Sequence, residues 1–359
     1  MTPTGEGEPV ATRSGAASKP PRHATAAGLR LDLVSAALVA EYTSDGRSQL
    51  LSAVRFAAPL QVPIGVRPET PILTIPLAPL DIDIAELWYG DRPTQRFEQQ
   101  GIVVADDGAL LFGSLHVQNA QTDELESLTR AAYVRILDLC STRGRPHLLR
   151  CWNVVPQINS ESLGLERYKL FCKGRAEGYA THIDETRLDS FLPASSAVGG
   201  HGTTLVIHFI ASREPGRHVE NPRQIAAYRY PPQYGPKSPS FARATVTPPS
   251  AGSLIFISGT ASIVGHESLH QHDLIAQLDE TMRNIRVLIE EIDEGPLSEA
   301  SLASRLAMLR VYVRRGADWP LLRASLRERL GDRVPLIAVS ADICRRELLL
   351  EIEGVARSR

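Results

Sequence analysis

The sequence of this chain of 359 residues predicts the same succession of strands and helices twice, and this repetition limits the folds that the chain can adopt. In each copy an apolar strand leads into an amphipathic helix, then a strand, a second helix and further strands. The first copy is expected at 109–115, 125–137, 148–155, 160–179 and 203–210, and the second at 254–259, 273–292, 308–314, 320–330, 335–339 and 348–355. The pattern predicts an α+β chain built by duplication, although two unrelated α+β halves would give a similar order.

Composition divides the chain into a tail and two units. Residues 1–28 are rich in alanine, glycine, serine, threonine and proline and lack the apolar run of a signal peptide, so we interpret them as a disordered tail. We expect a first unit with an N-terminal extension at 29–215 and a second unit at 216–359. The hydrophobic fraction of 43% is enough for a sizeable core.

Charge and cysteine content argue against several classes of protein. The formal charge of −2 disfavours a protein-wide surface for nucleic acid, and no segment reaches the roughly 18 to 20 apolar residues of a membrane span. The four cysteines lack the spacing of a zinc site or a disulfide framework, which favours a reducing cytoplasm. His266, His270 and His272 lie close together but fit no zinc signature, so we expect no bound metal.

Glu351 stands out because it lies inside the apolar strand predicted at 348–355. Two interpretations are open. Glu351 points to solvent while Ile352 faces the core, or it is buried with a raised pKa and is protonated near neutral pH. Cys344 precedes it across the expected turn of a terminal hairpin, so the two side chains are expected to lie close together.

Three motifs of the second unit point to a known fold. They are Tyr-Gly-Pro at 234–236, Ser-Gly at 258–259 and Glu-Ile-Glu at 351–353. With these motifs the unit resembles the small trimeric YjgF/RidA/RutC proteins, whose sites lie in clefts between subunits and include the first glutamate of the terminal motif, here Glu351. Those proteins also bind a substrate carboxylate with an arginine on the strand before the terminal glutamate. The corresponding stretches of this chain, 193–196 and 335–338, contain no arginine. The departure disfavours imine or enamine hydrolysis.

Longer strings of the chain give a more specific resemblance. They include Arg-Cys-Trp-Asn at 150–153, Arg-Tyr-Lys-Leu-Phe-Cys-Lys-Gly-Arg at 167–175, Glu-Asn-Pro-Arg-Gln at 220–224, Tyr-Arg-Tyr-Pro at 228–231, the run 234–244 and Ser-Gly-Thr-Ala-Ser at 258–262. In this order they make the chain, from about residue 30 to its end, similar to the chorismatases. The resemblance implies two tandem YjgF-like units, each a mixed sheet backed by helices.

The resemblance also implies a reaction. Chorismatases remove the enolpyruvyl side chain of chorismate as pyruvate, without a metal or organic cofactor. One branch hydrolyses chorismate to 3,4-dihydroxycyclohexa-1,5-diene carboxylate, and other branches release 3-hydroxybenzoate, sometimes with 4-hydroxybenzoate. Chorismate less pyruvate already has the composition of hydroxybenzoate, so only the diol requires net water.

This chemistry assigns roles to residues. Cleavage of an enol ether begins most readily with protonation of its methylene carbon, and Glu351 is the candidate acid. The two carboxylates of chorismate require cations, preferably arginine forks, and tyrosines add donors and flat walls. A glycine lets the main chain approach an anionic group. The candidate substrate-binding residues are Arg167, Tyr168, Arg175, Arg223, Tyr228, Tyr234, Arg243, Gly259 and Ala261.

Two residues bear on the product. In chorismatases the positions of Cys344 and Ala261 track product type: cysteine and glycine accompany 3-hydroxybenzoate, and alanine-like residues accompany hydrolysis. This chain has Cys344 with Ala261, so it mixes the two patterns. We expect mainly 3-hydroxybenzoate, with the hydrolytic diol and a non-catalytic YjgF-like metabolite-binding protein as alternatives. Because one chain contains two units, it can form a cleft within itself, and a monomer is expected.

Overall fold

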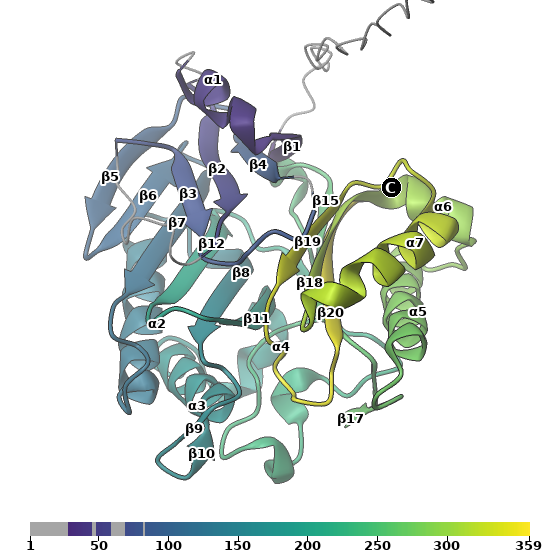
Figure 1. Cartoon of the computed structure of the whole chain (residues 1–359). Coiled ribbons are helices and arrows are strands. Elements are labelled where there is room, and N and C mark those ends of the chain that lie inside the picture. Colours follow the sequence, from purple (N-terminus) through teal and green to yellow (C-terminus); the bar gives the residue numbers. More distant parts are fainter. Residues whose placement is uncertain (1–27, 45–47, 59–68, 82) are drawn as a thin grey trace, which may run out of the picture.

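Two sheet-and-helix units lie side by side, with a smaller sheet near the N-terminal end of the chain (Figure 1). The computed structural model describes residues 28–44, 48–58, 69–81 and 83–359. The predicted tail, 1–28, lies outside the described residues except for Gly28. The limits of the two units, 29–215 and 216–359, stay predictions.

The first unit is a six-stranded mixed sheet covered by helices on one face. Its elements are β5 (Gln95–Gln99), β6 (Ile102–Asp106), β7 (Leu110–Val117), α2 (Leu125–Thr142), β8 (His147–Pro156), β9 (Glu161–Ser162), β10 (Leu165–Glu166), α3 (Arg167–Tyr179), α4 (Leu188–Phe191), β11 (Ala194–Gly200) and β12 (Leu205–Ser212). The strand order is β11-β8-β12-β7-β6-β5, with β11 parallel to β8. Apolar residues of one sheet face form a core with α2 and α3.

The second unit repeats this arrangement strand for strand. Its elements are β13 (Arg217–Val219), β14 (Ala244–Val246), β15 (Leu254–Thr260), β16 (Ile263–Val264), β17 (Glu267–Ser268), α5 (Leu274–Asp293), α6 (Glu299–Arg305), β18 (Leu306–Val313), α7 (Trp319–Leu330), β19 (Leu336–Ser340) and β20 (Leu350–Arg357). The order β19-β18-β20-β15-β14-β13 matches that of the first sheet, and β19 is parallel to β18. The predicted α+β class with two tandem units is therefore confirmed.

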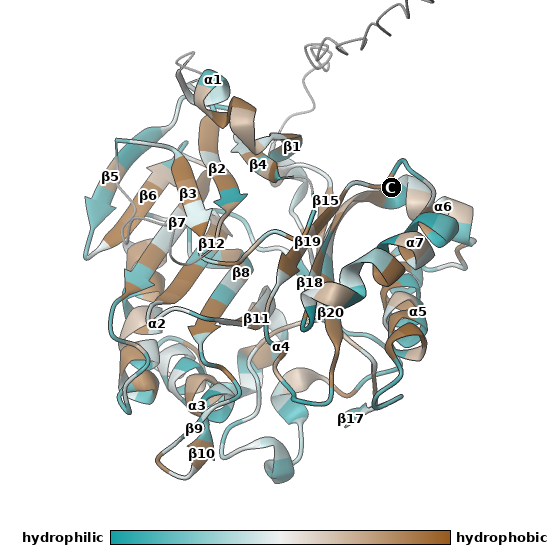
Figure 2. Ribbon diagram, in the orientation of Figure 1, coloured by the Kyte–Doolittle hydropathy of each residue, from teal (hydrophilic) through white to brown (hydrophobic). Residues whose placement is uncertain are grey.

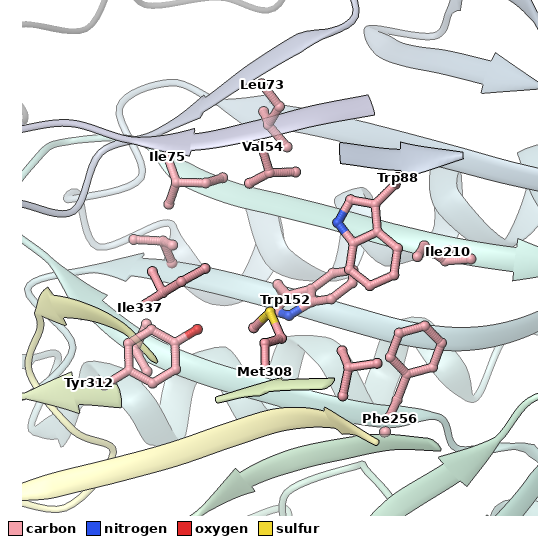
Figure 3. Close-up of a cluster of buried hydrophobic side chains, with 14 of the residues drawn as sticks. Val54, Leu73, Ile75, Trp88, Trp152, Ile210, Phe256, Met308, Tyr312 and Ile337 are labelled. Carbon is pink, nitrogen blue, oxygen red and sulfur yellow. The ribbon is translucent and has the colours of Figure 1, made fainter. Parts of the chain in front are cut away.

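A third sheet, which the sequence analysis did not anticipate, is built from the N-terminal extension. It contains β1 (Arg30–Ser35), β2 (Leu50–Phe56), β3 (Ile72–Ile75) and β4 (Ile84–Tyr89), in the order β1-β4-β2-β3, and α1 (Val39–Ser44) follows β1. Apolar side chains of all three sheets meet in one core. Trp88, Trp152 and Phe256 come from one sheet each, with ring centroids 5.8 to 6.2 Å apart (Figure 3). The strands that meet there are largely hydrophobic (Figure 2).

Two local expectations were wrong. The helix expected at 160–179 begins at Arg167, because the residues before it form the small β9–β10 hairpin, in which Leu163 and Gly164 have positive φ angles of 53° and 75°. The expected terminal hairpin is also absent, since β18 lies between β19 and β20 in the sheet. Cys344 therefore lies in a crossover loop.

Strand β20 has two different faces. Leu350 and Ile352 point into the core beneath α5 and α7. Glu351 and Glu353 point to the opposite face, because successive side chains of a strand alternate. That face looks toward the first unit, and the exposed fraction of Glu351 is only 3%. The solvent-facing interpretation of Glu351 is wrong.

Candidate active site

The site is a cavity between the two units, with about 760 Å³ of empty space, part of it open to solvent. The first unit contributes α3 and β11, and the second contributes β15, β20 and the loops beside them. The lining residues are Glu166, Tyr168, Lys169, Arg175, Ser195, Ser196, Ala197, Tyr230, Tyr234, Pro239, Phe241, Arg243, Gly259, Ala261, Ile263, Cys344, Arg345 and Glu351.

Glu351 is a buried carboxyl group at the wall of this cavity. Burial, the largest effect, and the neighbouring charge of Glu353 raise its pKa, while Arg150 and Arg243 partly oppose the shift, and the pKa reaches about 8. Below about pH 8 the side chain is therefore mostly protonated. A neutral carboxylic acid at the wall of a cavity can donate a proton to a bound molecule.

Glu353, two residues further along β20, has the opposite character. Burial by itself would raise its pKa, but the guanidinium groups of Arg310 and Arg150 and a hydrogen bond from Ser196 lower it. Arg150 Nη2 lies 2.6 Å from Glu353 Oε2, and the indole of Trp152 donates to Oε1 over 2.9 Å. The two glutamates therefore differ in protonation state: Glu353 is an ionised carboxylate and Glu351 is a neutral carboxylic acid.

Cys344 lies beside the acid. Its Sγ is 4.0 Å from Glu351 Oε2. Burial raises the pKa of the thiol well above its usual value, and the Glu351 charge adds to the effect. Cys344 is therefore a neutral thiol at neutral pH. Ala261 lies on the same cavity wall, so both of the residues expected to bear on the product reach the cavity.

Arg175 on α3 is a buried cation of the site. The residue is 1% exposed, and Nη1 has a weak contact of 3.5 Å with Ser195 Oγ. Its Nε and Nη2 atoms have no hydrogen-bond partner among the described residues. A buried guanidinium with unused donors is costly unless a ligand completes its hydrogen bonds, and a carboxylate suits its planar fork.

Arg243 is a second buried cation. Its Nη2 donates to the hydroxyl of Tyr230 over 2.8 Å and to the carbonyl of Ile225 over 3.1 Å. The guanidinium also lies 5.1 Å from the ring centre of Phe241. These contacts hold the charge at the cavity wall.

Several lining residues were not among the predicted ones, and of these Arg345 and Lys169 are cationic and Glu166 is acidic. Arg345 lies 4.2 Å from the ring centre of Tyr234 and donates to the carbonyl of His266 over 2.8 Å. A signal was present, because Arg345 directly follows Cys344 and Lys169 directly follows Tyr168. With Arg175 and Arg243 they place four cationic side chains around the cavity, against the carboxyl groups of Glu166 and Glu351.

Three predicted binding residues do not reach the cavity. Arg167 donates to the backbone carbonyls of Ala120, Gln121, Thr122 and Pro156, so its charge stabilises the turn before α2. Arg223 pairs with Glu280 and Asn284 on α5. Tyr228 packs against the core of the first unit. The other predicted residues, Tyr168, Arg175, Tyr234, Arg243, Gly259 and Ala261, line the cavity with Cys344 and Glu351.

Gly259 has a different role from the one expected. Its N–H donates to Ser196 Oγ over 2.9 Å, and the N–H of Ser258 donates to the carbonyl of Arg243 over 3.0 Å, so neither group is available to a ligand. A Cβ atom at position 259 would lie 1.9 Å from Glu351 Oε1. The glycine provides the space in which the acid lies.

Gly259→Ala is expected to lower kcat roughly tenfold or more, because the added methyl group displaces the carboxyl group and misplacement of about 1 Å is costly. The displaced atoms are the end of a flexible side chain, so we expect the melting temperature to change little. Gly295→Ala is the matched control, since no atom lies within 4 Å of its added Cβ. Equal kcat values for the two variants would contradict this role.

The described residues contain neither a metal-binding cluster nor a membrane-spanning helix. In the part of the chain that the structure describes, histidine, cysteine, aspartate and glutamate side chains do not gather in threes as a metal site would require. His266 instead contacts the hydroxyl of Tyr234 at 3.1 Å, and His270 contacts Glu280 at 3.3 Å. Across residues 28–44, 48–58, 69–81 and 83–359, each helix is too short or too polar to span a bilayer.

The two-unit fold and the cation-lined cavity with its buried acid are the features expected of a protein that binds a small anionic molecule. Comparisons identify the group. The family model described as chorismatase FkbO/Hyg5-like, N-terminal, matches residues 86–211. A 3-hydroxybenzoate synthase from Streptomyces hygroscopicus is 37% identical over 289 residues, which cover 78% of this chain and 83% of that protein.

Two further relatives agree. A chorismatase from Streptomyces rapamycinicus is 37% identical over 282 residues, covering 77% of this chain and 83% of that protein. The crystal structure of a chorismatase, 29% identical, superposes with a TM-score of 0.80 and covers 93% of this chain and 100% of that one. This chain belongs to the chorismatase family of enzymes, as its sequence motifs predicted.

Proposed function

We propose that this enzyme converts chorismate into pyruvate and hydroxybenzoate, mainly the 3-isomer, with Glu351 as the proton donor. The observation that carries the proposal is the state of Glu351, a buried carboxyl group with a pKa raised to about 8 at the wall of a cationic cavity. The name of the relative from Streptomyces hygroscopicus, 3-hydroxybenzoate synthase, supports the product. The 4-isomer as a second product stays a prediction.

Glu351 performs the first chemical step in this proposal. The neutral carboxyl group donates its proton to the methylene carbon of the enolpyruvyl group, which becomes a methyl group and leaves an oxocarbenium ion. When the bond between the ring and the ether oxygen breaks, that oxygen becomes the carbonyl of pyruvate. The hydroxyl oxygen on ring carbon 4 then bonds to carbon 3, the carbon that lost the ether, and releases its proton, which gives an epoxide. Opening of the epoxide at carbon 4 and loss of the proton on carbon 3 give 3-hydroxybenzoate, whereas loss of the proton on carbon 4 without this shift gives the 4-isomer. The carboxylate of Glu351 is reprotonated. No net water is consumed on this route.

The cations of the cavity bind the substrate in this proposal. Chorismate is a dianion, and Arg175 and Arg243 offer planar guanidinium groups for its carboxylates. Arg345 and Lys169 add positive charge at the same cavity. Tyr234 and Tyr230 supply flat surfaces and hydroxyl groups beside the ring.

The position of Cys344 supports 3-hydroxybenzoate as the main product. A neutral thiol 4.0 Å from the acid can contact the ring without acting as a nucleophile. The alternative product is the diol of the hydrolytic branch. Ala261 favours it, because the alanine-like pattern at that position accompanies hydrolysis.

Product analysis in water enriched in heavy oxygen tests the proposal. The purified protein is given chorismate, pyruvate is trapped at once as lactate, and the ring product is identified by mass and ultraviolet absorption. We expect hydroxybenzoate together with pyruvate that lacks solvent oxygen. The diol with labelled pyruvate would establish the hydrolytic branch instead, and no pyruvate above the rate without enzyme would overturn the proposed function.

We further propose that a single chain is the active unit, because residues 166–197, 230–263 and 344–351 of one chain line the cavity. No nucleic acid or membrane partner is proposed. The location proposed for the enzyme is the cytoplasm, where unpaired cysteines such as Cys140, Cys151, Cys172 and Cys344 are stable.

A further inference from the structure

A buried row of alternating charges connects the N-terminal sheet with the strand that carries the acid. Glu86 on β4 pairs with Arg310 on β18, and the other arm of Arg310 pairs with Glu353 on β20. Glu353 Oε2 in turn lies 2.6 Å from Arg150 Nη2 on β8. None of these four side chains is more than 2% exposed. Two carboxylates and two guanidinium groups leave the row without net charge.

The far end of this row is held in place by a second contact. The indole Nε1 of Trp88 donates to Glu86 Oε2 over 3.1 Å. Trp88 packs against Trp152 and Phe256, which come from the other two sheets (Figure 3). Glu86 does not line the cavity. Its side chain is therefore directed into the interior, where it contacts the second unit instead of substrate.

Glu351 lies at the near end of the row, two residues before Glu353 on the same face of β20. Several other charged or titratable groups surround Glu351. They are Glu353 on its own strand, Arg150 on β8, Tyr312 on β18, Arg243 before β14, Cys344 in the β19–β20 loop, and Tyr168 and Arg175 on α3.

We propose that Glu86 is a positioning residue for the reaction, which acts through Arg310 and Glu353 to keep the proton on Glu351; this inference rests on the proposed function. The physical reason is charge balance. With Glu86 ionised, the row is neutral and its field at Glu351 is small. Without the charge of Glu86 the row has one excess positive charge, which favours the ionised form of Glu351.

This role explains why the N-terminal sheet carries a buried carboxylate, Glu86, which it would not need if it only covered the two units. An apolar cover needs no charge, and burying a carboxylate far from water is costly unless it is paired. Glu86 pairs with an arginine that already has a carboxylate partner, Glu353. The second carboxylate therefore balances the second arginine, so that Glu353 is held by two cations without making the surroundings of Glu351 positive.

Charge-changing variants test the inference. The pH dependence of kcat/KM is measured for the parent, Glu86→Gln, Arg310→Gln and the double variant, with Glu86→Asp as the conservative replacement. In the parent, activity is expected to fall as pH rises through about 8, because the protonated acid is lost. Glu86→Gln is expected to lower that midpoint by roughly 0.5 to 1 pH unit, and Arg310→Gln to raise it. The double variant and Glu86→Asp are expected to stay near the parent value.

A second measurement separates this inference from the proposed function. The protein is labelled with carbon-13 at glutamate carboxyl groups, and the Glu351 resonance, identified by its loss in Glu351→Gln, is titrated without chorismate. The same order of midpoints is expected. If the variants release pyruvate but their midpoints coincide by both methods, the inference is wrong while the function stands. If no protein releases pyruvate but the resonance midpoints move as expected, the proposed function fails and the control of the proton by Glu86 is supported.

Folding of each variant is checked by circular dichroism and thermal melting. If Glu86→Gln does not fold alone, its effect is obtained as the difference between Arg310→Gln and the double variant, where the same downward shift of the midpoint is expected. A purely structural role of Glu86 predicts lower activity and stability with an unchanged midpoint, and that result would overturn the proposal.

Discussion

Replacing Glu351 by glutamine is expected to lower kcat for pyruvate release by roughly 10²- to 10⁴-fold. The amide has nearly the same shape as the neutral carboxyl group, but it is not an acid and cannot protonate the methylene carbon. Pyruvate release is followed with a coupled lactate dehydrogenase assay. Glu347→Gln is the matched control. Glu347 lies in the loop before β20, its side chain accepts a hydrogen bond from the hydroxyl of Ser268, and it does not line the cavity.

The same variant has a signature in stability that does not depend on turnover. Glu351 has a pKa near 8 in the folded protein against an ordinary value of 4.5, so between these values the folded state binds more protons than the unfolded state. The free energy of unfolding of the parent therefore falls as pH rises through this window. Glu351→Gln lacks this contribution, so its stability relative to the parent is expected to increase from pH 5 to pH 8. A variant with near-parental kcat and no such trend would rule out Glu351 as a buried acid.

Arg175→Met is expected to reduce kcat/KM by roughly 10²- to 10³-fold, mainly through KM. Each charge-assisted hydrogen bond from its guanidinium group to a substrate carboxylate is worth about 1.5 to 3 kcal/mol. Methionine preserves much of the volume without the charge. Because the guanidinium has no charged partner among the described residues, we expect the melting temperature of the free protein to rise. Steady-state kinetics and thermal melting measure the two effects.

Arg167→Met is the control from the same helix and should show the opposite behaviour. Its guanidinium donates to four backbone carbonyls that would be left without their donors. We expect a lower melting temperature and a KM within a few-fold of the parent. If both variants raised KM equally, the assignment of Arg175 as a substrate-binding residue would be wrong.

The fold was predictable where the chain is long and periodic. The helices that begin near residues 125 and 274 and the strand that contains Glu353 carry strong apolar patterns, so the duplicated units could be predicted from the sequence. The N-terminal sheet could not. Its strands are four to seven residues long, and β4 pairs with both β1 and β2, a non-local arrangement that no local pattern encodes.

The site was predictable where one residue conflicts with its local pattern. Glu351 was found because a carboxyl group in an apolar strand needs an explanation. Arg167 and Arg175 could not be separated, because residues eight positions apart differ by only about 80° around a helix. Only the tertiary structure places backbone carbonyls over the first and a cavity beside the second. Arg345 was missed because its direction depends on the loop conformation, which has no periodic signal.

The equivalence of the two sheets shows that the units have different tasks. Strand β12 of the first unit corresponds to β20 of the second, and β8 corresponds to β18. By this register Val206, opposite Val154, takes the place of Glu351, which lies opposite Tyr312. In the same way His208, opposite Trp152, takes the place of Glu353, which lies opposite Arg310. The first unit thus has apolar or neutral residues where the second has its carboxylates. Its contribution to the cavity is instead the wall that carries Arg175.

Since both walls of the cavity belong to one polypeptide, assembly of the site does not depend on protein concentration. A site shared between separate subunits is lost on dilution, when the subunits dissociate. Here the peptide link through residues 213–216 keeps the acid and Arg175 at a fixed effective concentration. The specific activity of the chain is therefore expected to be the same at the lowest and the highest enzyme concentrations.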